Sequence, residues 1–92
     1  MRPWAQSLLK SFLLGVRIME DIFIVSEDQA NAAYRKAQEL ADTYKDWRWG
    51  QCVFNAFYAF FPDECNKLRG TDDDCFYRND RVEKFLSHFQ VR

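Results

Sequence analysis

The sequence predicts a small all-α domain, an orthogonal bundle of four to five helices around a central apolar helix. Hydrophobic residues make up 48% of the 92-residue chain and aromatic residues 17%, which is enough for one compact core. Helix start and stop signals divide the chain into short segments with apolar residues at helical spacing. The most apolar run, Trp47 to Phe61, leaves no polar face if it is helical. We therefore expect it in the middle of the bundle.

The first segment, residues 1–18, has Pro3 at a permitted first-turn position and a basic, amphipathic pattern. We expect either a helix packed on the domain, with a membrane-surface helix as the alternative, or an extension upstream of a start at Met19. In every case the helical domain covers residues 19–92. Lys10 interrupts the apolar stretch, which is too short to span a bilayer, so a membrane partner is disfavoured. The apolar side chains at helical spacing are Trp4, Leu8, Leu9, Phe12, Leu13 and Val16.

A helix is predicted from Ser26 to about Tyr44, after a short β-branched run at residues 22–25. No second strand-like segment is apparent, so we expect that run to be an extended or helix-terminal piece packed on the core. Ser26 and Gln29 form a capping box, which marks the helix start. Because one face is mostly alanine, a bulky neighbour can approach closely, and the central aromatic helix is that neighbour. This face carries Ala30, Ala33, Tyr34, Ala37, Leu40, Ala41 and Tyr44.

Two further helices are predicted after the central one. Pro62 suits the first turn of a short helix that ends at Gly70 as its C-terminal cap. Residues 71–79 are a polar loop. A last helix begins near Asn79 or Asp80, where Asp80-x-x-Glu83 has the form of a capping box. We expect this helix to bury Val82, Phe85, Leu86 and Phe89.

No complete catalytic, cofactor or metal motif is present, so we predict a protein that is not an enzyme, has no cofactor and has no metal site. Cys52, Cys65, Cys75 and His88 are zinc-ligand types, but they lie 13, 10 and 13 positions apart, without the close pairs of structural zinc sites. The acidic triplet 72–74 lacks the glycine and the distal glutamate of a calcium loop. Three cysteines without a CxxC pair indicate reduced thiols in the cytoplasm.

Charge gives no support for a nucleic-acid partner. Thirteen Lys and Arg against fourteen Asp and Glu leave a net charge of −1. Without a positive field to attract a polyanion, nucleic acid is disfavoured as a ligand.

The candidate binding residues combine planar aromatic side chains with guanidinium groups. If the central helix and the 70–79 loop are neighbours, these groups converge on a surface suited to anchoring a partner protein or stacking on a base. The alternative is that the tryptophans complete the core, the amides satisfy the loop backbone and the arginines pair with aspartates. In either case Asn55, inside an apolar helix, is predicted to fasten the loop. The candidate residues are Trp47, Arg48, Trp49, Gln51, Asn55, Arg69, Thr71, Tyr77, Arg78 and Arg81.

The same region resembles a group of short phage and bacterial proteins with no established activity. The resemblance covers about residues 47–89, and a proline often stands in that group where this chain has Cys75. It implies a small accessory protein, phage- or prophage-encoded, that binds a host factor and does not catalyse. It is carried by Trp47-Arg48-x-Gly50-Gln51-x-x-Phe54-Asn55, Pro62, Leu68-Arg69-Gly70-Thr71, Asp74-x-Phe76-Tyr77-x-x-Asp80, Val82 and Phe85-Leu86.

The sequence thus predicts a small non-catalytic binding module. A partner protein is the expected ligand, and the aromatic excess makes a homodimer a reasonable state. The alternative function is a nucleotide or small-ligand binder that uses the tryptophan and arginine side chains.

Overall fold

The computed structural model describes residues 22–91, which form a mostly helical domain with one small parallel sheet. The expectations for residues 1–18 lie outside the described part of the chain. Among the described residues there are four α-helices, one 3₁₀ turn and two short strands. In chain order the elements are β1 (Phe23–Val25), α2 (Glu27–Thr43), α3 (Trp49–Phe60), α4 (Pro62–Leu68), η1 (Asn79–Arg81), α5 (Val82–Ser87) and β2 (Phe89–Val91).

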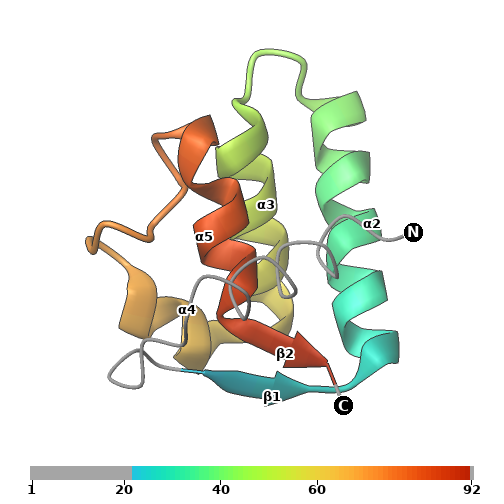
Figure 1. Ribbon diagram of the computed structural model, residues 1–92. Helices are drawn as coiled ribbons and strands as arrows, with labels where there is room; N and C mark the ends of the chain where they lie inside the picture. Colours follow the sequence, from blue (N-terminus) through green and yellow to red (C-terminus); the bar gives the residue numbers. More distant parts are fainter. Residues whose placement is uncertain (1–21, 92) are drawn as a thin grey trace.

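Helices α2 and α3 form the main packing unit of the domain and run antiparallel, side by side (Figure 1). The alanine face predicted for α2 is the contact surface, because Ala30, Ala33 and Ala37 are all buried. Small side chains on one helix and phenylalanines on the other allow close approach without leaving a void. The predicted partnership between these two segments is therefore confirmed.

The predicted start of α2 is also confirmed. Ser26 is the N-cap, and its hydroxyl oxygen accepts a hydrogen bond from the Gln29 amide at 3.1 Å. The helix ends at Thr43, with Tyr44 as its C-cap, one residue from the expected end. Local capping chemistry alone was sufficient to place this element.

Helix α3 covers 12 residues of the apolar run and is not surrounded on all sides. It begins at Trp49, so Trp47 and Arg48 belong to the connection from α2. Ala59 and Phe60 are exposed near its end, and Phe60 keeps 38% of its surface accessible. The helix is buried on its α2 side and along the side that faces α5 and the loop. The lack of a polar face in the sequence thus predicted more burial of α3 than the structure has.

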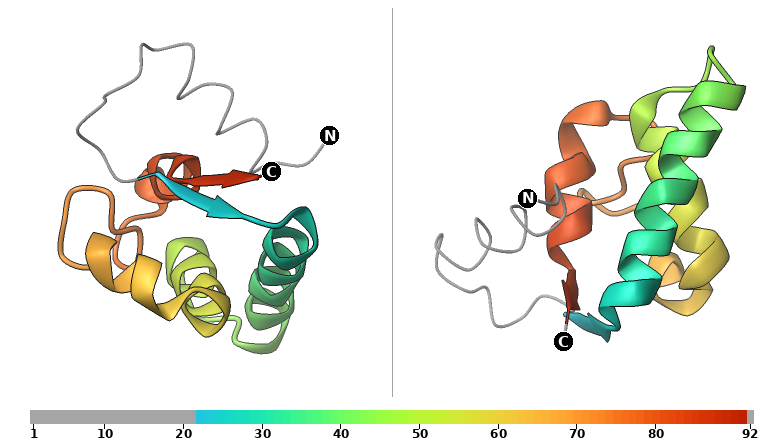
Figure 2. Two further views of the ribbon diagram at one scale, coloured as in Figure 1. Left: turned by 90° about the horizontal axis from the view of Figure 1, so that it is seen from below. Right: turned by 90° about the vertical axis from the view of Figure 1, so that its right-hand side faces the viewer.

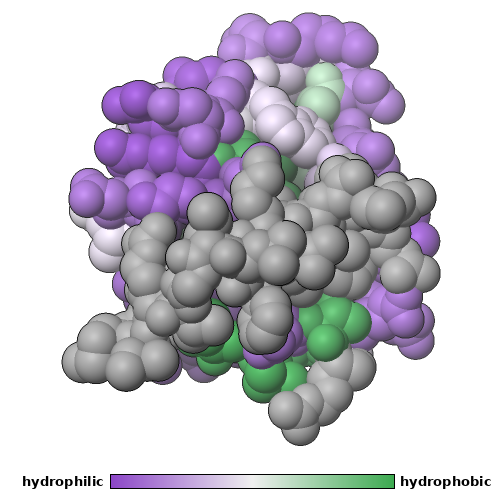
Figure 3. Space-filling view, viewed as in Figure 1, coloured by the Kyte–Doolittle hydropathy of each residue, from purple (hydrophilic) through white to green (hydrophobic). Residues whose placement is uncertain are grey.

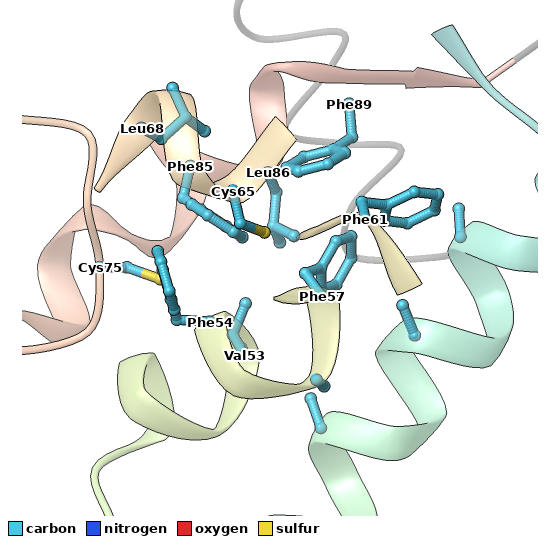
Figure 4. Packing of buried hydrophobic residues seen from close by; sticks show 14 of the residues in the cluster. Val53, Phe54, Phe57, Phe61, Cys65, Leu68, Cys75, Phe85, Leu86 and Phe89 are labelled. Atoms are coloured by element: carbon cyan, nitrogen blue, oxygen red, sulfur yellow. The ribbon is translucent and has the colours of Figure 1, made fainter. Parts of the chain in front are cut away.

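Phenylalanine side chains from four elements fill the interior (Figure 4). Phe57 lies at the centre, with ring centroids 5.8 Å from Phe85 and 5.0 Å from Phe89. All three side chains are at least 98% buried. Tilted and edge-to-face rings at these distances pack densely and favourably. The core therefore joins α3 to the C-terminal segment as well as to α2.

A parallel two-stranded sheet replaces the unpaired extended run that we expected. Phe23 pairs with Phe89, Ile24 with Gln90 and Val25 with the last residue of β2. Figure 2 shows the two strands along one edge of the molecule, beside the start of α2. The expectation that no second strand exists was wrong. The strand at residues 89–91 is short and directly follows α5, so Phe89 looked like a further apolar residue of that helix. Phe89 is buried as predicted, but from a strand.

The predicted capping box at Asp80 does not form. A 3₁₀ turn, Asn79–Arg81, leads into α5, and neither element has a side-chain hydrogen bond at its N-cap. The Asp80 carboxylate instead accepts hydrogen bonds from the Arg78 guanidinium at 2.7 and 3.1 Å. The nearby guanidinium competes for the carboxylate that the helix start would have used. By contrast, Pro62 does open α4, and Gly70 follows that helix with a φ of 78°, as predicted.

On the face shown in Figure 3, the visible described residues are mostly polar in the upper part, and apolar residues gather near the strands below. Ile22 and Ile24 are 45% and 49% exposed at that edge. None of the helices that the structure describes has the length and apolar character needed to cross a lipid bilayer.

Candidate binding surface

The loop between α4 and η1 is fixed to the first turn of α3. The Gly50 amide, which has no partner within its own helix turn, donates to Asn79 Oδ1 at 2.8 Å. The Cys75 thiol donates to the Gly50 carbonyl at 3.3 Å. A Cβ atom at position 50 would lie 2.1 Å from the Cys75 carbonyl oxygen, so only glycine permits this approach. Both polar groups of one glycine therefore hold the loop against the helix.

Asp74 fixes the shape of the loop itself. Its carboxylate accepts hydrogen bonds from the Gly70 amide at 2.8 Å and from the Phe76 amide at 2.9 Å. Thr71 closes the preceding turn, because its hydroxyl donates to the Leu68 carbonyl at 2.7 Å. Asx and Thr side chains of this kind hold backbone that has no regular secondary structure.

Besides the two hydrogen bonds to Gly50, a third anchor joins the loop to the end of α5. Nε2 of His88 lies 2.6 Å from Asp73 Oδ2, and the His88 side chain is only 3% exposed. The Lys84 ammonium lies 3.3 Å from the other carboxylate oxygen. Burial raises the pKa of Asp73, but the hydrogen bonds and positive charges of His88 and Lys84 outweigh burial, and the net pKa is lowered. The ionised carboxylate is thus the form that the folded loop stabilises.

Held in this way, the loop lays its aromatic side chains beside those of α3 and forms a continuous surface. The Phe76 ring stands edge-on to Phe54, with centroids 5.9 Å apart, and Tyr77 follows at 4.8 Å from Phe76. A guanidinium group lies over each end: Arg48 is 5.4 Å from the Tyr77 centroid, and Arg69 is 5.2 Å from the centroid of Tyr58. We call this surface the Arg–aromatic strip. It consists of Arg48, Tyr77, Phe76, Tyr58 and Arg69, with buried Phe54 beneath.

The strip is accessible over most of its length. Tyr77 is 73% exposed, the largest value among the exposed large hydrophobic side chains of residues 22–91. Arg48 and Arg69 are exposed, and Phe76 and Tyr58 are half-buried. Arg69 also lies 5.5 Å from the Phe54 centroid, so its aliphatic and guanidinium atoms cover a core ring.

The structure separates the two tryptophans from the loop. Trp47 stacks on Tyr44, with centroids 4.2 Å apart and ring planes at 13°. Trp49 stands edge-on to Tyr34 at 5.8 Å and packs against the core. Both side chains are half-buried against rings of α2 or its C-cap. Arg48, from the same side of the predicted cluster, does meet the loop, because its Nε donates a hydrogen bond to the Phe76 carbonyl oxygen at 3.4 Å.

The remaining predicted residues divide among smaller roles. Arg78 pairs with Asp80, and Thr71 belongs to the turn after α4. Gln51, Asn55 and Arg81 are half-buried. Within residues 22–91 no hydrogen bond joins the Asn55 side chain to the loop. The connection that we predicted for Asn55 is made by Asn79, which accepts from the Gly50 amide. The fastening amide therefore comes from η1, at the end of the loop, and not from α3.

The three cysteines lie in the interior as free thiols. Burial and the negative charge of Glu64 raise the pKa of Cys65 to about 12, and burial and Asp74 also raise the pKa of Cys75 (Figure 4). Thiols kept protonated in this way are poor nucleophiles and poor metal ligands. Among residues 22–91 no group of three or more His, Cys, Asp or Glu side chains is placed to hold a metal ion.

Sequence reasoning missed Tyr58 and Phe76 as parts of the surface and Asp73, Asp74 and Asn79 as its supports. One of these was within reach of local rules, because an aspartate two residues before Phe76 is the pattern of an Asx turn. The others depend on which distant backbone lies nearby, and local patterns carry no such information.

No protein-family model, curated protein or solved structure matches this chain in the three comparisons made.

Proposed function

We propose that the protein is a small non-catalytic binding module that holds a partner protein on the Arg–aromatic strip. The observation that carries this proposal is an exposed tyrosine between two guanidinium groups on a loop anchored at three places. Exposed aromatic and arginine side chains are the residue types enriched at the energetic centres of protein interfaces. A loop already fixed in one conformation loses little further conformational entropy when it binds.

The proposal places the protein in the cytoplasm, where three free thiols remain reduced. A phage or prophage origin and a host factor as the partner follow only from the resemblance of residues 47–89. A homodimer through the strip is the form that the proposal takes if the partner is a second copy of the chain.

Nucleotide or small-ligand binding has weaker support. That alternative requires the tryptophans and arginines to form one cluster, and Trp47 and Trp49 instead contact Tyr44 and Tyr34. The rings that remain available for stacking belong to the strip, which is a surface and not an enclosed site.

Site-specific photo-crosslinking tests the proposal. A photoreactive residue replaces Tyr77 in one variant and exposed Arg35 of α2 in a matched control, in cells that naturally contain the protein. We expect discrete protein adducts from position 77 only, and we expect Arg48→Gln to reduce their yield. Adducts at twice the mass of the chain identify the homodimer. The same adducts from both positions, or none from position 77, would contradict the proposal.

A further inference from the structure

The two guanidinium groups of the strip differ from the lysines and the arginine of residues 22–91 that form salt bridges. Arg78 pairs with Asp80, Lys84 with Asp73, and the lysines of α2 and its following turn have carboxylates three residues away. Among the described residues, no such salt bridge involves Arg48 or Arg69. Each lies instead over an aromatic ring. The Arg48 Nε donates a hydrogen bond to the Phe76 carbonyl oxygen at 3.4 Å. Stacking uses the face of a guanidinium, so the terminal N–H groups of both arginines can still donate to an acceptor.

The spacing of these two groups matches one form of peptide. Arg48 precedes the first turn of α3, while Arg69 lies over Phe54 and Tyr58. The Arg48 guanidinium lies over Tyr77, whose ring is 4.8 Å from that of Phe76, and the Phe76 ring is 5.9 Å from that of Phe54. Two ring-to-ring steps, on the order of 10 Å together, therefore separate the two guanidinium groups. In an extended peptide, side chains at positions i and i+4 lie on one face, roughly 13 Å apart. The side chain at i+2 lies on the same face, midway between them.

We infer that the strip recognises an extended acidic segment of a partner protein, with carboxylates at positions i and i+4 and an apolar side chain at i+2. The carboxylates accept hydrogen bonds from Arg48 and Arg69, and the central side chain lies over Phe76 and Tyr77. This inference rests on the proposed function and names the chemistry of the partner. Charge-assisted bonds at both ends and an apolar contact in the middle fix the direction and register of the segment.

The charges around the strip favour a short acidic peptide over a nucleic acid. Asp72, Asp74 and Asp80 lie on the loop or at its end, and the whole chain has a net charge of −1. These carboxylates repel the continuous phosphate charge of a polynucleotide. A peptide with two carboxylates places negative charge only where the two arginines lie.

Fluorescence anisotropy with synthetic peptides tests the inference at low salt. The probe is a labelled peptide Ser-Glu-Ser-Phe-Ser-Glu-Ser with blocked ends. The first control replaces both glutamates with glutamine. The second moves the second glutamate one place toward phenylalanine, onto the opposite face of the strand. We expect the first change, which removes two charge-assisted pairs, to weaken binding about a hundredfold, and the second, which removes one pair, to weaken it about tenfold.

Protein variants provide the reciprocal test. Arg48→Gln and Arg69→Gln should each weaken binding of the probe about tenfold, while Arg35→Gln on α2 should leave it unchanged. Circular dichroism checks that all three remain folded. Equal binding of the glutamate and glutamine peptides, or tighter binding of a labelled oligothymidylate than of the probe, would overturn the inference.

Failure of this inference can be distinguished from failure of the proposed function. Crosslinks from position 77 together with equal binding of the charged and neutral peptides would leave a protein-binding strip with a different specificity. Loss of the crosslinks would remove the basis of both proposals.

Discussion

The α2–α3 pair and the 69–78 loop are held by opposite means. The helix pair is joined by dry contact between alanines and phenylalanines. The loop is instead joined to its neighbours by hydrogen bonds, from the Cys75 thiol to the Gly50 carbonyl and between Asp73 and His88. Apolar contact tolerates small shifts of backbone, but a hydrogen bond needs a defined distance and direction. The loop is therefore fixed in position while its aromatic side chains remain at the surface.

The largest effect is expected from removing the centre of the helix pair. Phe57→Ala should lower the free energy of unfolding by about 4 kcal/mol, because it leaves a cavity among Phe85 and Phe89. Urea denaturation measures this loss. Phe60→Ala, at an exposed position of the same helix, is the matched control, and we expect it to cost less than about 1 kcal/mol. Equal losses would show that the assigned core is wrong.

The next effect breaks the contact between the two regions. Gly50→Ala should cost about 3 kcal/mol, because the new methyl group meets the backbone oxygen of Cys75 and one partner must shift. Gly70→Ala adds a methyl group into open space and should cost only about 1 kcal/mol, through its φ of 78°. Thermal or urea unfolding of both variants compares them directly. A larger loss for Gly70→Ala would contradict the assigned helix–loop contact.

A smaller effect tests the anchor between the loop and α5. Because the pKa of Asp73 is lower in the folded state, its contribution is fully present above the ordinary carboxyl pKa and is lost as pH falls through the folded pKa. Asp73→Asn should therefore cost about 1–2 kcal/mol near neutral pH and progressively less below roughly pH 4. Urea unfolding across pH measures the difference. Asp72→Asn, in the exposed part of the loop, should show no such trend. If the cost of Asp73→Asn stayed constant to low pH, the assigned contact of the ionised Asp73 carboxylate with α5 would be contradicted.

The smallest effect on stability is expected at the strip itself. Tyr77→Ala removes a side chain that is 73% exposed and should change the unfolding free energy by less than about 0.5 kcal/mol. The same substitution should weaken binding of the partner that the crosslinks from position 77 identify, measured by co-purification of that partner with the protein. A large loss of stability would instead assign Tyr77 a structural role.

Sequence reasoning was accurate where structure depends on neighbours along the chain. The Ser26 cap, the alanine face of α2 and the Pro62 start of α4 all follow from local spacing, and all are present. It failed for β1 and β2, because the pairing of two three-residue strands depends on where the rest of the chain brings them. Strands this short carry too little pattern of their own to be recognised.

The candidate site was predicted only in part, for the same physical reason. The sequence identified the arginines, Tyr77 and the loop as parts of a candidate surface. It could not show whether the two tryptophans would pack against the loop or against α2. Trp47 stacks on Tyr44 and Trp49 stands edge-on to Tyr34, so both tryptophans contact rings of α2 or its C-cap. The choice of Asn79 over Asn55 as the fastening amide likewise depends on which side chain reaches the free Gly50 amide.

Hydrogen exchange at the Gly50 amide tests the central claim most directly, namely that the loop is firmly held against α3. A first-turn amide has no partner in its own helix, so its protection reports the bond to Asn79 Oδ1. We expect protection comparable to that of amides in the middle of α3, and loss of that protection in Asn79→Ala while the rest of α3 remains protected. Exchange at the rate of an unprotected amide in the unaltered protein would contradict the claim.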